Sequence, residues 1–346
     1  MPAYARKNFG YWSGQLTVSS YQQDLTDGGL DIIRLQNDRV DVAIVPAAGG
    51  KIIELIDRRS GRNWLWRNPH IPLALTRRGA DFDSEQDSGG WDEILLSVKP
   101  GRIRSASKEF GAIPDHGDLI DSKWAVDNLE VTSAGDVVCD MTAVGTSAPY
   151  CFKRQLRLHD NEAVIDLDYT LANTGDEPLP AYWCAHPLIA IEPGATIDID
   201  GSPLVRVDDA AMRQLTARGS EHCWPVLKLS DGKSLNLSEA FNSGGAQSLI
   251  ASKIFVRSPA TGAASIRLGD DERLTFKFDP SELPWLGLWI NNRGWSGCGS
   301  EPYTNLGFEP ATCPYDCVNE AIENEAVPWL EAGSERRWGL RLELQS

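Results

Sequence analysis

The chain has 346 residues, of which 42% are hydrophobic and 24% charged, so it can bury a large core as one big β domain or as two ordinary ones. Its 49 acidic residues outnumber 33 basic ones, and the formal net charge of -16 disfavours nucleic-acid and membrane-surface partners, because both are anionic. No apolar run approaches the roughly 18 residues that span a bilayer, and we find no secretory signal. Seven scattered cysteines indicate reduced thiols, and we expect a cytoplasmic protein without a metal site.

Alternation of apolar and polar residues is the dominant local pattern along the chain. This period is typical of half-buried strands, and it is clearest over residues 152–159, 165–171 and 337–344. Turn-forming clusters separate such runs at 173–176, 192–194, 230–232 and 332–334. Only residues 318–326 favour a helix, of one or two turns. The pattern therefore predicts an all-β fold, a large antiparallel β-sandwich of two packed sheets, in a single domain over 1–346.

Two histidines occupy contexts that favour exposure to a ligand. His116 lies at the centre of a turn over 114–118. In the strand expected over 182–188, His186 shares one face with Tyr182 and Cys184, and Pro187 is expected to end regular pairing just after it. A lone histidine on a strand is more often packed or solvated than catalytic, so each residue by itself is also compatible with a structural role.

A third segment, residues 285–291, carries a strand face rich in aromatic groups. Its odd positions are Trp285, Gly287, Trp289 and Asn291, whereas its even positions are aliphatic. Flat aromatic faces pack against the C–H-rich faces of sugars, so this strand suits the wall of a carbohydrate cleft. The alternative is that both tryptophans fill the core between the sheets.

A fourth segment, residues 305–310, presents a carboxylate from a strand. Leu306 and Phe308 are expected to face the core, and Asn305, Gly307 and Glu309 the opposite side. The glycine two residues before the carboxylate leaves room for a ligand to approach.

Taken together, these segments resemble a divergent branch of the aldose 1-epimerase (galactose mutarotase-like) superfamily, and the resemblance covers most of the chain. It is carried by the order and spacing of several motifs: a first hairpin over 40–55, a Gly-Gly-aromatic loop at Gly89-Gly90-Trp91, His116-Gly117, His186, the segment 305–310 and a closing hairpin over 330–344.

The resemblance implies a β-supersandwich with a concave sugar-binding face and a cofactor-independent isomerase. Such a mutarotase interconverts the α and β anomers of an unphosphorylated monosaccharide by acid–base ring opening. Glu309 would be the base, His186 the acid, and His116 a hydrogen-bonding group near the ring oxygen. The expected substrate-binding residues are Trp91, Trp285, Trp289, Asn291, Asn305 and Asp279, of which Asp279 is the candidate for an aspartate used by the family.

The resemblance leaves three points open. Arg77 and Arg78 are the candidates for an arginine that the family uses before its glycine-rich loop. The same fold could serve a carbohydrate-binding or regulatory protein without turnover, or a lyase or hydrolase acting on a larger glycan along a longer groove. The protein is expected to be a monomer or a homodimer.

Overall fold

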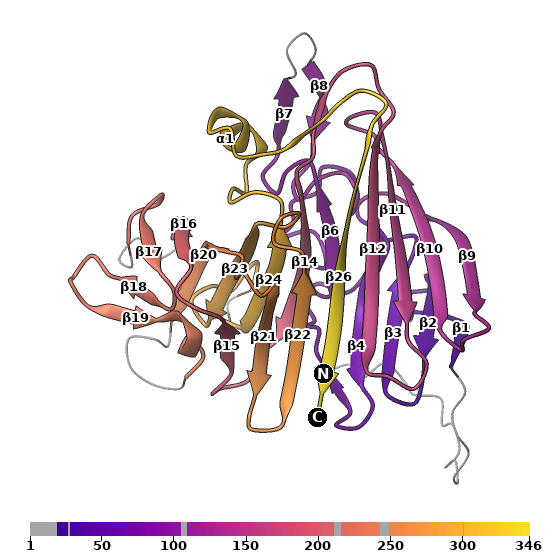
Figure 1. Cartoon of the computed structure of the whole chain (residues 1–346), viewed down its shortest axis with the longest axis horizontal. Helices are drawn as coiled ribbons and strands as arrows, with labels where there is room; N and C mark the ends of the chain where they lie inside the picture. Colours follow the sequence, from indigo (N-terminus) through magenta and orange to yellow (C-terminus); the bar gives the residue numbers. More distant parts are fainter. Residues whose placement is uncertain (1–18, 27, 105–108, 211–215, 243–248, 300) are drawn as a thin grey trace.

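Two large antiparallel sheets face each other in the computed structural model of the chain, which describes residues 19–26, 28–104, 109–210, 216–242, 249–299 and 301–346 (Figure 1). The larger sheet of the described ranges has 14 strands. In order across it they are β1 (Ser20–Leu25), β2 (Asp31–Gln36), β3 (Val40–Val45), β4 (Lys51–Asp57), β6 (Trp91–Leu95), β14 (Trp183–Ala190), β24 (Thr304–Ala311), β23 (Trp285–Asn292), β20 (Ile250–Arg257), β16 (Leu204–Ala210), β17 (Glu221–Cys223), β18 (Val226–Lys228) and β19 (Ser234–Asn236), with β5 (Arg62–Asn63) beside β4.

The second sheet has eight strands and contains all three runs with the clearest alternation. In β12, for example, Ile165, Leu167, Tyr169 and Leu171 are buried and the residues between them are not. Across the sheet the strands are β15 (Thr196–Ile199), β21 (Ala263–Leu268), β22 (Glu272–Phe278), β26 (Glu335–Gln345), β12 (Val164–Asn173), β11 (Tyr150–Leu158), β10 (Val137–Val144) and β9 (Ala125–Val131). The predicted all-β fold of large antiparallel sheets is confirmed.

Smaller elements cover one end of the molecule. The antiparallel pair of β7 (Gly101–Arg104) and β8 (Glu109–Ile113) lies beside the helix α1 (Val318–Glu323) (Figure 1). This helix falls within residues 318–326, the segment predicted to be helical. The expected closing hairpin is wrong: β25 (Trp329–Leu330) pairs with β13 (Leu179–Pro180), whereas β26 pairs with β12 and β22. The two helices found in the described ranges, α1 and the 3-10 helix η1 (Leu237–Glu239), are too short to cross a membrane.

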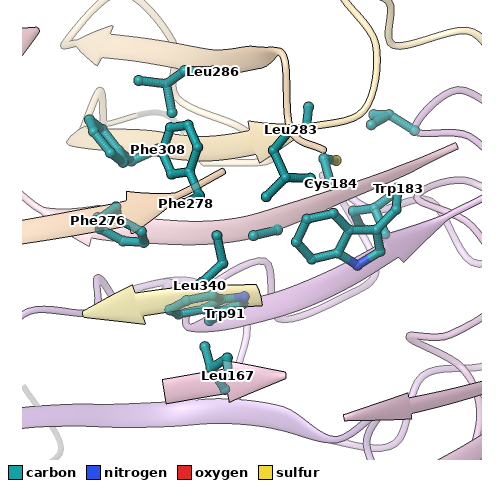
Figure 2. Close-up of a cluster of buried hydrophobic side chains, with 14 of the residues drawn as sticks. Trp91, Leu167, Trp183, Cys184, Phe276, Phe278, Leu283, Leu286, Phe308 and Leu340 are labelled. Atoms are coloured by element: carbon teal, nitrogen blue, oxygen red, sulfur yellow. The ribbon is translucent and has the colours of Figure 1, made fainter. Parts of the chain in front are cut away.

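The core fills the space between the two sheets. Phe276 of β22 packs against Phe308 of β24, with ring centroids 4.8 Å apart (Figure 2). Trp183 of β14 packs against Trp338 of β26. One ion pair is buried in this apolar layer: Arg154 Nη1 lies 3.2 Å from Glu93 Oε1, and both side chains are at most 1% exposed. Because one face of the large sheet is buried in this core, a functional site on this sheet is expected on its other face.

Candidate active site

A cavity of about 260 Å³ lies over the middle of the large sheet, on the face turned away from the core. As predicted, Leu306 and Phe308 of β24 point into the core, while Asn305 and Glu309 point the other way and line the cavity. The walls come from connections that are distant in sequence: the loop before β6, the segment after β6, the turn before residue 117, and the segments after β23 and β24.

Strand register brings the polar residues of the cavity together. Lys253 in β20 lies opposite Trp289 in β23, and Trp289 lies opposite Gly307 in β24. Side chains two residues apart along a strand share a face, so Glu309 projects from the same side as Trp289 and Lys253. Three neighbouring strands thus present a carboxylate, an aromatic surface and a cation to one small space.

His186 reaches the cavity where two strands separate. In β14, Cys184 pairs with Ala311 and Leu188 with Gly307 of β24, and no pairs form between them. Pro187 has no N–H to donate on this side, which explains the interruption. The expectation that Pro187 ends regular pairing is wrong, because Pro187 itself pairs with Trp91 of β6 and pairing with β24 resumes at Leu188.

The interruption places His186 beside Glu309. Its Nε2 lies 3.8 Å from Glu309 Oε1, and both side chains are nearly inaccessible to solvent. Glu309 Oε1 and His186 Nδ1 have no hydrogen-bond partner within the described part of the chain, and the same holds for both amide atoms of Asn305. Buried polar atoms are almost always satisfied, so this group of open donors and acceptors suits a polar ligand.

His116 lines the cavity next to His186, with ring centroids 5.2 Å apart, and a carboxylate contacts its Nδ1. Its Nδ1 is 2.9 Å from Asp115 Oδ1, and its ring stacks on Phe82 at a centroid distance of 3.5 Å. The turn requires positive φ angles of 58° at His116 and 77° at Gly117. Burial would raise the pKa of Asp115, but hydrogen bonds from His116 and from the Phe82 N–H hold that pKa below its ordinary value.

The electrostatic surroundings of the two histidines differ. Burial lowers the pKa of His186 well below its ordinary value, and the positive charges of His116 and Lys253 lower it further. At neutral pH the His186 imidazole is therefore neutral. The His116 ring, by contrast, has the Asp115 carboxylate in direct contact with Nδ1.

The sequence did not indicate several charged residues of the cavity, among them Lys253 and Asp316. Lys253 forms a buried ion pair with Glu309, and its Nζ lies 3.6 Å from Asp316 Oδ1. Burial would lower the pKa of Lys253, but the carboxylates of Asp316 and Glu309 raise it above its ordinary value. Burial also raises the pKa of Asp316. No group of three or more His, Cys, Asp or Glu in the described ranges is arranged to hold a metal ion.

Aromatic groups line the cavity from several elements. Trp289, one of the expected sugar-contacting residues, is joined by Phe82, Trp295 and Tyr303, which the sequence did not indicate. Asn291 does not line it. Its amide oxygen accepts hydrogen bonds from the N–H groups of Gly294 and Trp295, so it shapes the loop that carries Trp295.

Several expected site residues lie elsewhere. Trp91 points into the core, where it is 1% exposed and packs on Phe276, because the inward side of β6 carries its odd positions (Figure 2). Trp285 has the orientation of Trp289 but lies beyond the cavity, with the Arg257 guanidinium 5.1 Å from its ring centroid. Asp279 is at the surface in a turn, where it accepts hydrogen bonds from Ser281.

The two arginines suggested by the resemblance also pair outside the cavity. Arg77 forms an ion pair with Glu85, and Arg78 forms one with Asp121. Two larger hollows exist, one on the outer face of β12, β22 and β26 and one beside β7 and α1, but both are shallower and more open. Neither holds a histidine or an aromatic wall comparable to that of the cavity over the large sheet.

Gly307 makes the close packing around Glu309 possible. A Cβ at this position would lie 2.5 Å from Glu309 Oε1 and 2.9 Å from the Trp289 Cβ. We expect Gly307→Ala to displace the carboxylate and to lower activity at the site by about 10- to 100-fold, as sub-ångström to ångström misplacements do. Gly101→Ala is the control, because its new methyl group would meet only the Asn319 amide at 3.6 Å. Unchanged kinetics in Gly307→Ala would show that the carboxylate position is not critical.

Comparison with known proteins gives a clear answer for the fold. No protein-family model and no curated protein matches the sequence. Among solved structures, a galactose mutarotase-like protein from Clostridium acetobutylicum superposes with a TM-score of 0.67 at 15% identity, over 94% of this chain and 98% of that one. A protein from Klebsiella pneumoniae described as a candidate aldose 1-epimerase gives 0.69 at 15% identity, over 96% and 84%. One from Escherichia coli K12 with the same description gives 0.63 at 13% identity, over 91% and 99%.

These similarities extend over nearly the whole chain at low sequence identity. The chain therefore has the galactose mutarotase-like fold, and the predicted resemblance is confirmed at the level of the fold.

Proposed function

We propose that the protein is an aldose 1-epimerase that interconverts the anomers of one unphosphorylated monosaccharide in the cavity over the large sheet. The observation that carries the proposal is the placement of a buried carboxylate, Glu309, beside the His186 imidazole, with the His116 ring next to His186 and an aromatic wall around them. A volume of about 260 Å³ is slightly below the usual range for small-molecule sites, roughly 300 to 1,000 Å³. A single sugar ring suits this space better than an extended glycan does.

In the proposed reaction Glu309 acts as the base. Its Oε1 has no hydrogen-bond partner and takes the proton of the anomeric hydroxyl. The bond between the anomeric carbon and the ring oxygen breaks, the ring oxygen gains a proton, and the aldehyde end rotates. Closure on the other face returns both protons and gives the other anomer. Each positioned acid or base typically contributes about 10²- to 10⁴-fold.

The surroundings of the histidines favour His116 as the proton donor to the ring oxygen. The resemblance gives this role to His186, but burial lowers the pKa of His186 and leaves it neutral. His116 lines the cavity and has the Asp115 carboxylate 2.9 Å from Nδ1, a contact that fixes the orientation of its ring. In this version of the mechanism His186 donates a hydrogen bond to the substrate beside Glu309.

The test is exchange of anomers measured by NMR across a panel of aldoses that includes hexoses, pentoses, deoxysugars and uronic acids. We expect acceleration of at least one neutral sugar. His116→Gln should then lose about 10²-fold or more in rate, and His186→Gln should lose less. A sugar that raises the melting temperature without faster exchange would support the binding-protein alternative. If His186→Gln lost more activity than His116→Gln, His186 would be the proton donor instead.

A further inference from the structure

We infer that Lys253 is a positioning residue that fixes Glu309 by one carboxylate oxygen and leaves the other as the single proton acceptor of the site. The inference rests on the proposed function, because it assigns a task within the same reaction. It concerns a residue in the middle of β20, 56 positions before the carboxylate that it contacts.

The geometry separates the two oxygens of Glu309. Oε2 is paired with Lys253 Nζ, whereas Oε1 has no hydrogen-bond partner and faces His186 Nε2 at 3.8 Å. Lys253 also forms an ion pair with Asp316, whose Oδ1 lies 3.6 Å from Nζ. An ammonium between two carboxylates cannot swing freely, so it prevents Glu309 from rotating its free oxygen away from the cavity.

Stability alone does not explain a lysine at this position. The Lys253 side chain is 6% exposed, and moving an ammonium and its carboxylate partners out of water is costly, so such an ion pair is weak evidence for a stabilising role. A buried ion pair of this kind is often replaceable by apolar side chains without loss of stability. Its presence against the carboxylate that lines the cavity indicates a role in holding that carboxylate charged and oriented.

Titratable groups face Lys253 from four parts of the chain. Glu309 projects from β24, Asp316 from the segment after it, and Asp208 from β16, while His186 and Cys184 project from β14. Burial keeps the thiol pKa of Cys184 well above its ordinary value, so this group carries no charge near neutrality. Lys253 is therefore the closest cation to Glu309 in the described part of the chain, and its removal should make proton uptake by the carboxylate easier.

The experiment compares Lys253→Met with Lys51→Met. Lys51 is a matched control, since it is 7% exposed and paired with buried Asp92 at 2.6 Å but does not contact Glu309. For the sugar that the wild type converts, we expect Lys253→Met to lower kcat about 100-fold with KM within about threefold. Its loss of activity on acidification should begin at a higher pH than in the wild type. Lys51→Met should lose stability but keep the acidic limb of the wild-type pH profile.

Further variants keep the test decisive. Lys253→Arg retains the charge and should restore the acidic limb, and Lys253→Gln replaces Lys253→Met if the latter does not fold. The inference is overturned if the Lys253 variants reproduce the wild-type pH profile, or if they shift it no more than Lys51→Met does.

A readout without turnover separates this inference from the proposed function. In protein labelled with ¹³C at glutamate carboxyl carbons, the Glu309 signal is identified by its absence in Glu309→Gln. We expect it to become protonated at a higher pH in Lys253→Met than in the wild type. If no sugar is converted but the signal shifts, the proposed function fails and the positioning role stands. An unshifted signal would refute the positioning role even in an active enzyme.

Discussion

Glu309→Gln is expected to reduce anomer exchange by about 10²- to 10⁴-fold, the usual contribution of a positioned base. An amide has the shape of the carboxylate but cannot take the proton of the anomeric hydroxyl. The cavity should remain intact, because Lys253 keeps Asp316 as a partner and Gly307 still accommodates the side chain. Exchange rates from NMR at several sugar concentrations give the result, and we expect kcat to fall while KM changes little.

Glu343→Gln is the control for this variant. Glu343 pairs with Lys277 on the exposed face of the second sheet, so its replacement removes a similar ion pair far from the cavity. We expect normal exchange and a melting temperature close to that of the wild type, since surface pairs contribute little. If Glu309→Gln retained exchange within about threefold of the wild type, another group would have to be the base.

The strands and their inward faces could be predicted because apolar and polar residues alternate along a strand that has one buried face. Leu306 and Phe308 identify the face of β24 that packs in the core, so Glu309 and Asn305 must lie on the opposite face. For Trp91 the alternation of residues does not predict the orientation of the side chain. A strand with apolar residues on both sides, such as β6, does not reveal which side is the core, and only the packing against Phe276 settles it.

The charged partners of the site could not be predicted for a different reason. Lys253 lies in an apolar strand where a lysine is expected to point to solvent, and its partners Glu309 and Asp316 belong to another strand and the segment beyond it. The pairing depends on the register between β20, β23 and β24, which a single sequence does not contain. The same holds for Trp295 and Tyr303, which reach the cavity from a loop whose shape depends on Asn291.

The ion pair between Arg154 and Glu93 gives the largest effect expected on stability. Glu93 also accepts hydrogen bonds from Tyr169 and Trp183, but Arg154 is its cationic partner in the core. Arg154→Met leaves this carboxylate buried without a counter-charge, and we expect a loss of roughly 3–5 kcal/mol in the free energy of unfolding. Urea denaturation at pH 8 followed by intrinsic fluorescence measures it.

The pH dependence of this loss in the free energy of unfolding tests whether it arises from the charge of Glu93. Burial raises the pKa of Glu93 from 4.5 to about 7, against the opposing effect of Arg154. The folded protein therefore binds this proton more tightly than the unfolded chain, and the associated stability is present below pH 4.5 and lost as the pH rises through about 7. Removal of Arg154 raises the pKa of Glu93 further, so the loss caused by Arg154→Met should be larger at pH 8 than at pH 5.

Arg341→Met is the matched variant for this comparison. Arg341 pairs with Asp166 on the outer face of the same sheet but is 47% exposed, so its replacement should cost less than about 1 kcal/mol at either pH. An Arg154→Met loss that was as small, or that did not change between pH 8 and pH 5, would mean that the Glu93 carboxylate does not depend on this cation. The expected contrast follows mainly from burial, because each arginine pairs with a carboxylate, but Arg154 lies on the buried face of the sheet and Arg341 on its exposed face.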